Sequence, residues 1–247
     1  STRYFAIEVS TANSGITVAS GAPTTNIDFI GLQIKIVTGV SALSAFFINA
    51  VTGDCRIEYC LLLGVDGGTT GTHHRGISWE TSSTGTLYAN NNLIYEFITA
   101  STGNDQGIRV SAGTAYTYNN TIANCAVGIT RSGGTWTAKN VVAQSNTTDF
   151  SGTCTSCEDN VSDDATAPGT GSSTSTSVTF ADEANNDYFL ASGDTGAKDV
   201  GTDYSADANN PITKDYVGTT RPSGASWDRG AHELIQTAAG SRRVIIP

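Results

Sequence analysis

A short pattern that occurs three times between residues 76 and 146 constrains the fold of this chain more than any other feature. Each copy has a Gly-Ile pair, then a gap of variable length, then an aromatic residue and an Asn-containing corner. The copies read Gly76-Ile77 to Tyr88-Ala89-Asn90-Asn91-Asn92, Gly107-Ile108 to Tyr116-Thr117-Tyr118-Asn119-Asn120, and Gly128-Ile129 to Trp136-Thr137-Ala138-Lys139-Asn140. Repeats of about 20 to 30 residues with short strands and Asn or Gly corners are typical of solenoids, whose units bury their apolar faces by stacking.

One corner position extends the pattern in both directions along the chain. The residues assigned to it are Gly31, Cys60, Asn92, Asn120, Asn140 and Asn160. Asn tolerates a left-handed bend, and its amide can bond to the coils above and below, so we interpret these asparagines as architectural. A constant corner with variable insertions predicts an all-β chain that forms a single right-handed parallel β-helix.

Alternation predicts which side chains face the core. Cys55 and Ile57 alternate with Arg56 and Glu58, and two charges cannot both face a packed core without partners, so Arg56 and Glu58 face outward. Carried to the later coils, this parity places a set of residues inside, namely Leu87, Ala89, Ala115, Thr117, Thr135 and Thr137. It places Tyr88, Tyr116 and Trp136 outside, as a row of flat rings that could bind sugar or a partner's apolar surface. With the opposite parity the three rings are a core stack.

Composition narrows the function classes. The 247 residues suit one large domain, and a net charge of −10 argues against binding a nucleic-acid backbone. No stretch is apolar enough for a membrane span, and the first residues lack the apolar core of a secretory signal. The cysteines are odd in number, which indicates synthesis in a reducing compartment; they are Cys55, Cys60, Cys125, Cys154 and Cys157.

The chain divides into three parts by pattern. Residues 1–165 are expected to form the coils, and residues 166–233 a final coil with an irregular polar cap over the open strand edges. Residues 234–247 read as a linker followed by an apolar, basic tail. The tail residues Val244, Ile245 and Ile246 are suited to adding a strand to the sheet edge of a neighbouring protein subunit.

The end of the chain resembles a known family. Thr220-Arg221-Pro222 is followed by Trp227-Asp228-Arg229-Gly230-Ala231-His232-Glu233, which is similar to the Arg-Pro and Asp-x-Gly-Ala-x-Glu segment that closes many bacterial and phage β-helix proteins. Together with the coils, this segment resembles the pectate-lyase-like superfamily of right-handed parallel β-helices. The resemblance implies the fold, but the group includes lyases, hydrolases, adhesins and virion proteins, so it implies no single activity.

The richest polar stretch is residues 66–75. In an enzyme of this superfamily, Asp66 and His73 would be the candidates for holding Ca²⁺, and Arg75 would be a base or charge stabiliser toward a uronic acid. His74 and Glu80 complete the candidate catalytic set. The competing interpretation is a solvated Gly-rich loop, which we favour because no cluster of acids surrounds Asp66.

Other polar residues are weaker candidates. Glu80 and Glu96 match a glycosidase only by residue type, since that reaction needs two carboxylates about 5 to 10 Å apart. Arg109 and Arg131 do not occupy the same repeat position. Cys154 and Cys157 make half of a zinc site, so a free or locally bonded pair in a turn is the better interpretation. A last group could bind Ca²⁺ or form a salt-bridged cap; it comprises Arg221, Asp228, Arg229 and Glu233.

These observations predict a non-enzymatic structural or attachment module on the outer surface of a virion or cell. It would contact neighbouring protein subunits through its tail, and surface polysaccharide through the aromatic row. The alternative is a polysaccharide lyase or glycoside hydrolase that acts on an acidic polysaccharide through residues 64–80, with Ca²⁺ as a possible cofactor. A sugar-binding module without turnover is the third hypothesis.

Overall fold

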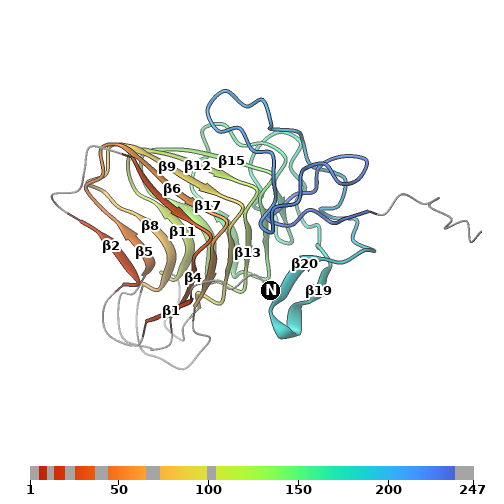
Figure 1. The fold of residues 1–247 in the computed structure, drawn as a ribbon, viewed down its shortest axis with the longest axis horizontal. Helices are drawn as coiled ribbons and strands as arrows, with labels where there is room; N and C mark the ends of the chain where they lie inside the picture. The colour runs from red at the N-terminus through yellow and green to blue at the C-terminus, as the bar shows by residue number, and fades with distance from the viewer. Residues whose placement is uncertain are drawn as a thin grey trace, which may run out of the picture.

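The computed structural model is a parallel β-helix, as the repeats predict. It describes residues 6–9, 14–19, 26–36, 44–64, 73–98 and 104–236. Successive strands enter three parallel sheets in turn, so each of the first five coils contributes one strand to each sheet (Figure 1). The chain is therefore wound as a solenoid whose coils pair with the next through backbone hydrogen bonds.

The three sheets have the following strands. Sheet A contains β1 (Ala6–Val9), β4 (Gln33–Ile36), β7 (Leu61–Leu63), β10 (Leu93–Tyr95), β13 (Thr121–Ala123), β16 (Val142–Gln144) and β18 (Val161–Ser162). Sheet B contains β2 (Ile16–Val18), β5 (Ser44–Ile48), β8 (Arg75–Trp79), β11 (Gln106–Val110), β14 (Val127–Arg131) and β17 (Thr148–Ser151). Sheet C contains β3 (Ile27–Ile30), β6 (Asp54–Glu58), β9 (Thr86–Asn90), β12 (Thr114–Tyr118) and β15 (Thr135–Lys139).

The core consists of columns of like residues in register from coil to coil. In sheet A, Ile34 aligns with Leu62, Ile94 and Ile122, and all four side chains are fully buried. Sheet B has its own column, formed by Phe46, Ile77, Ile108, Ile129 and Phe150. Because residues in a strand alternate between the two faces, the residues directly before and after each column residue in its strand face outward.

The glycine of each repeat is required by the close approach of the next coil. A Cβ on Gly76 would lie 2.6 Å from the Gly107 carbonyl oxygen, and one on Gly107 would lie 2.7 Å from that of Gly128. Gly128 faces the Asp149 carbonyl oxygen at 2.5 Å in the same way. Contacts this short to backbone cannot be relieved by turning a side chain, so there is no room for a Cβ at Gly76, Gly107 or Gly128.

We therefore expect Gly107→Ala to lower the free energy of unfolding by about 1–3 kcal/mol, as overpacking does in a tight core. Urea-induced unfolding of the purified chain measures the change. Gly193→Ala is the matched control, because a Cβ there meets nothing within 4 Å. Equal stability of the two variants would contradict this account of the repeat.

The corner between sheets C and A contains two adjacent columns. The first has left-handed backbone, with φ between 51° and 68° at Gly31, Tyr59, Asn91, Asn119, Asn140 and Asp159. The second carries an amide ladder: Asn92 Oδ1 accepts from the Cys60 N–H at 2.9 Å, and Asn120 Oδ1 accepts from the Asn92 N–H at 3.0 Å. The sequence prediction merged the columns, because Gly31 and Asn140 belong to the bend whereas Cys60, Asn92, Asn120 and Asn160 belong to the ladder.

The predicted inward and outward orientation of side chains in sheet C is confirmed for β6, β9 and β12 and is wrong for β15. Leu87, Ala89, Ala115 and Thr117 are fully buried, and Arg56 and Glu58 face outward. In β15, however, Trp136 aligns with Ala115, and Thr137 aligns with Tyr116. Trp136 is therefore a core residue, fully buried and stacked on Phe150, while Thr135 is exposed.

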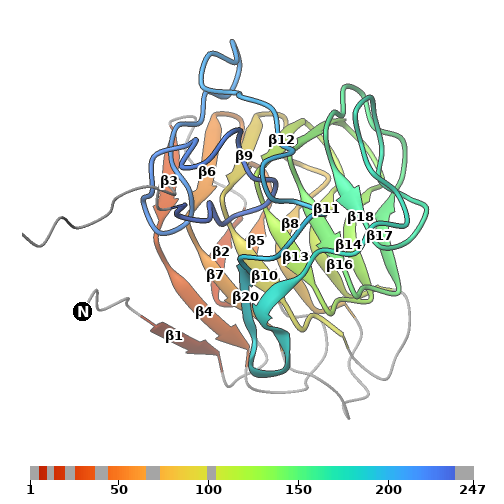
Figure 2. The ribbon, with the colours of Figure 1, turned by 90° about the vertical axis from the view of Figure 1, so that its right-hand side faces the viewer.

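The C-terminal segment closes one end of the solenoid and then returns along its flank. Residues 163–176 follow the last coil, where Ser173 bridges to Val161 of β18. Residues 178–236 then run back across the earlier coils (Figure 2) and include the antiparallel hairpin of β19 (Phe180–Asp182) and β20 (Asp187–Leu190), joined by a 3-10 turn over Glu183–Asn185. The irregular segment predicted as an end cap is thus mostly a flank strap, a name we use for residues 178–236.

The flank strap covers part of the outer face of sheet A. A second apolar cluster joins Leu93, Tyr95, Ala123, Val142 and Val161 of the sheet with Val178, Phe180, Tyr188, Leu190, Ala197, Tyr216 and Ala231 of the strap. On β10 the outward residues Leu93 and Tyr95 are apolar, and the strap buries them. No helix in the described ranges is long and apolar enough to span a membrane.

Candidate functional site

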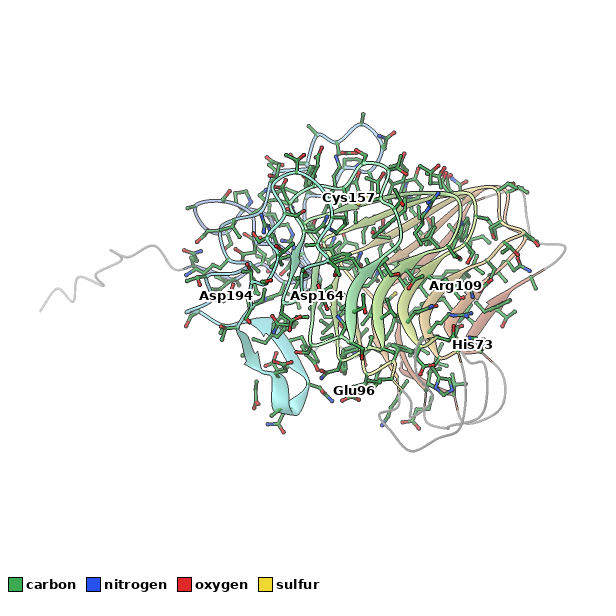
Figure 3. All side chains as sticks on the ribbon, turned by 180° about the vertical axis from the view of Figure 1, so that it is seen from behind. His73, Glu96, Arg109, Cys157, Asp164 and Asp194 are labelled. Atoms are coloured by element: carbon green, nitrogen blue, oxygen red, sulfur yellow. A yellow bond between two sulfur atoms is a disulfide. The ribbon has the colours of Figure 1, made fainter. Side chains whose placement is uncertain are left out.

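The residues of the predicted enzyme site partly converge on the outer face of sheet B. Arg75 lies at the start of β8 and bonds to Glu80 Oε1 (3.2 Å) and Ser78 Oγ (3.2 Å) through one guanidinium nitrogen. Its Nε donates to Gln106 Oε1 in the neighbouring strand β11 at 3.0 Å. We call His73, Arg75, Ser78, Glu80, Gln106 and Arg109 the sheet B cluster. Figure 3 labels two of its members, His73 and Arg109.

The sheet B cluster contains two guanidinium groups and one carboxylate. Arg109 Nη1 lies 3.9 Å from Glu80 Oε1, so this carboxylate sits between two guanidinium groups. Burial lowers the pKa of Arg75, and the nearby charge of Arg109 adds to the effect, whereas Glu80 and Asp105 oppose it. His73 Nδ1 lies 3.3 Å from the second terminal nitrogen of Arg75. The Arg75 side chain is therefore bonded within the protein at each of its three nitrogens.

This arrangement favours a structural role for Arg75. A general base must have a free lone pair near the substrate's proton, and an arginine fixed by four neighbours offers none. Arg109, whose side chain is 25 % exposed, is the more accessible cation of the pair. Chemically, the cluster ties β8 to β11 and presents one guanidinium group to solvent.

The metal prediction finds no support around His73 or His74. Asp66 lies outside the described residues. The His74 backbone N–H donates to Asp105 Oδ1 at 2.7 Å, and the His74 side chain is buried. Within the part of the chain that the structure describes, no group of three or more His, Cys, Asp or Glu side chains is arranged to hold a metal ion.

The second carboxylate of the predicted glycosidase pair lies elsewhere. Glu96 follows β10 in the corner between sheets A and B, where it lines a cavity of about 270 Å³ with Ile98, Asn124 and Ser145. Glu80 follows β8 in the corner between sheets B and C. A five-residue strand of about 16 Å separates these two corners, which exceeds the separation that glycoside hydrolysis needs.

Of the predicted aromatic row, only Tyr88 and Tyr116 lie on the outer face, and neighbouring side chains cover the faces of their rings. Tyr88 and Tyr116 stack on each other with ring centroids 5.5 Å apart and planes inclined by 18°. The Arg56 guanidinium lies 4.2 Å from the Tyr88 ring centroid, from the strand on the opposite side of Tyr116. The rings therefore face along the solenoid axis, toward their neighbours, rather than outward as a platform for sugar.

The cysteines are placed as structural residues. Cys154 and Cys157 form a disulfide in the turn after β17, which is the locally bonded pair of the sequence interpretation. Cys55, Cys60 and Cys125 are free and buried in the core, and burial raises the pKa of each thiol to about 12. A thiol with so high a pKa is protonated at neutral pH and reacts poorly.

The family-like segment at the end of the chain forms a salt-bridged network. Arg221 Nη1 bonds to Glu233 Oε2 at 3.0 Å, and both side chains are fully buried. Glu233 also accepts from the Ser223 and Asp228 backbone N–H groups. Arg229 donates to the Gly171 carbonyl at 2.8 Å. Of the two sequence interpretations, the structure supports the salt-bridged one.

An acidic group at the closed end was missed by the sequence analysis. Asp149 Oδ2 accepts from the backbone N–H groups of Asp163 and Asp164, and Asp164 Oδ2 accepts from that of Asp149. Burial raises the pKa of Asp149 to about 7, and the charges of Asp163 and Asp164 act in the same direction. These bonds seal the exposed edge of sheet B. The sequence signal was the Asp163-Asp164 pair, which alone does not indicate a partner.

The raised pKa of Asp149 predicts how stability depends on pH. Because the folded state binds this proton more tightly than the unfolded state, the contribution is fully present below about pH 4 and is lost as the pH rises through about 7. Asp149→Asn should therefore flatten the decline of the unfolding free energy between pH 5 and 8, measured by urea titration. Asp203→Asn is the control, because a hydrogen bond from Ser205 lowers that pKa; a slope equally flattened there would contradict the assignment.

Comparison with protein-family models, with curated proteins and with solved structures finds no match for this chain.

Proposed function

We propose that this protein is a non-enzymatic structural or attachment module on the outer surface of a virion or cell. In this proposal it is related to the pectate-lyase-like β-helix proteins and joins neighbouring subunits through its tail. The flank strap is the observation that carries the proposal. Arg221 of the strap reaches Asn91 of the coils, and Asn210 exchanges two amide bonds with Asn90 at 2.8 and 2.9 Å. A solenoid braced on one flank, by these bonds and by the apolar cluster between the strap and sheet A, suits a load-bearing or displayed part.

The polar side chains on two sheet faces support the same proposal. In the sheet B cluster, Arg75 and Glu80 bond to each other, and on sheet C the Tyr88 ring lies between Arg56 and Tyr116. A catalytic group must instead be available to a substrate. These contacts stiffen the outer faces of the coils, as a scaffold requires.

Deletion of residues 241–247 should abolish assembly and leave the fold intact. These residues lie outside the described ranges, and their sequence combines two arginines with Val244, Ile245 and Ile246. Light scattering after size exclusion measures the mass of the assembly, and circular dichroism with thermal unfolding checks the fold. An assembly of unchanged mass after the deletion would remove the role proposed for the tail.

A polysaccharide lyase or hydrolase is the second candidate, favoured by the convergence of His73, Arg75, Glu80 and Arg109. Acidic polysaccharides, incubated with and without Ca²⁺, test it through the release of reducing or unsaturated ends. Turnover that is lost in Arg75→Ala, with Arg131→Ala as the surface control, would reverse the ranking of the two functions.

A further inference from the structure

A groove crosses the outer face of sheet A at its first strands. It consists of two adjoining cavities of about 420 and 140 Å³, which share Gln33 and Leu61. The floor is formed by β4, β7 and β10, and one wall by β20 with Tyr216 and Val217. Glu8 and Lys35 line the far end, next to the edge strand β1.

The groove exists because the flank strap covers only part of sheet A. Toward β13 and β16 the outward residues are buried under Phe180, Tyr188 and Leu190. Toward β1 the hairpin no longer covers the strands, and β1 and β4 lie beside it in view (Figure 2). Leu61 and Leu63 are consequently only half-buried, and Val217 is 46 % exposed. The apolar face that the strap buries elsewhere is therefore open here.

We propose that this groove binds residues 241–247 of a second copy of the chain. This inference rests on the proposed function, in which the tail joins neighbouring subunits, and it names the surface that receives the tail. Val244, Ile245 and Ile246 would lie on Leu61 and Leu63, because burial of aliphatic side chains from both partners drives association.

The charges of the groove and of the tail support the tail as the occupant of the groove. The groove carries Glu8 and Asp187 against one cation, Lys35, so its net charge is negative, as is that of the whole chain at −10. The tail carries Arg242 and Arg243 directly before its apolar residues. Such complementarity favours binding of a basic, apolar segment in an acidic, apolar groove. The tail and the groove are on the same chain, so each copy offers one of each. A tail bound in the groove of the next copy makes a head-to-tail contact.

The test uses a labelled peptide with the sequence of residues 238–247 and the chain that lacks residues 241–247. Fluorescence anisotropy should show saturable binding, and Leu61→Arg and Val217→Asp should each weaken it at least tenfold. Ile30→Arg, at a residue of sheet C that is 50 % exposed, should leave the affinity unchanged. Thermal unfolding of each variant confirms that the groove variants are folded.

The same variants in the full chain separate this inference from the proposed function. We expect Val217→Asp and the tail deletion to abolish assembly alike, measured as mass against concentration. If the deletion abolishes assembly while both groove variants assemble normally, the groove assignment is wrong and the tail's role stands. If the full chain stays monomeric and excludes a peptide that the shortened chain binds, the tail occupies its own groove, which overturns the second copy as the occupant.

Discussion

Arg221→Ala is expected to lower the free energy of unfolding by about 3–5 kcal/mol, which is a large part of the stability of a typical domain. The substitution leaves the Glu233 carboxylate fully buried without its cation. It also removes bonds from the guanidinium to the Asp228 and Gly230 carbonyl oxygens, at 2.8 and 2.7 Å. Chemical denaturation followed by tryptophan fluorescence measures the loss.

Two further variants isolate the cause of that loss. Arg131→Ala is the matched control, because this arginine is partly exposed and its side chain bonds to the nearby Gly134 carbonyl. It should change stability by less than about 1 kcal/mol. Arg221→Ala combined with Glu233→Gln should recover part of the loss, because the buried charge is removed. Additive effects of the two substitutions would contradict the importance of the ion pair.

Trp136→Ala should also cost about 3–5 kcal/mol, since it empties a large space in the core. The indole is fully buried, stacks on Phe150 and donates its Nε1 hydrogen to Thr117 Oγ1 at 3.0 Å. Trp136→Phe should retain most of the stability, because it keeps an apolar ring in place.

Tyr88→Ala provides the comparison for Trp136. Tyr88 is half-buried on the outer face of sheet C, so its loss should cost less than half as much in the same thermal or chemical unfolding experiment. Equal losses at the two positions would mean that Trp136 does not fill the core as its burial indicates.

The repeats made the fold predictable, because their physical causes are local. The Gly before each Ile is explained by the close contact of its backbone with the next coil, and the alternation of inward and outward side chains is explained by strand geometry. Trp136 was misplaced because the third copy was aligned on its aromatic residue, whereas the hydrogen-bond register aligns it with Ala115. The same core position holds the small Ala115 in one coil and the large Trp136 in the next, and the surrounding side chains accommodate the difference. The period of the sequence pattern does not reveal such a change of size.

The flank strap and the sheet B cluster were harder to predict for a different reason. The contact between Arg221 and Asn91 joins residues far apart in sequence, and no repeat or spacing connects them. The polar types in residues 73–80 pointed to chemistry, but only the geometry shows that Arg75 is committed to Gln106, Ser78 and Glu80. The sequence showed where polar residues are concentrated. The hydrogen-bond partners of those residues, which determine whether they can act on a substrate, are seen only in the structure.

The flank strap also has a consequence for how the molecule folds. In an ordinary solenoid each coil touches only its neighbours, so unfolding can begin at one end and spread coil by coil. Here Asn210 and Arg221 hold the coil of Asn90 and Asn91 from a segment made much later in the chain. Because such distant contacts must close before they stabilise anything, folding should be slow, and the third coil should resist fraying until the strap detaches. Amide hydrogen exchange would then show β9 and β12 opening together with residues 204–231, as one cooperative unit.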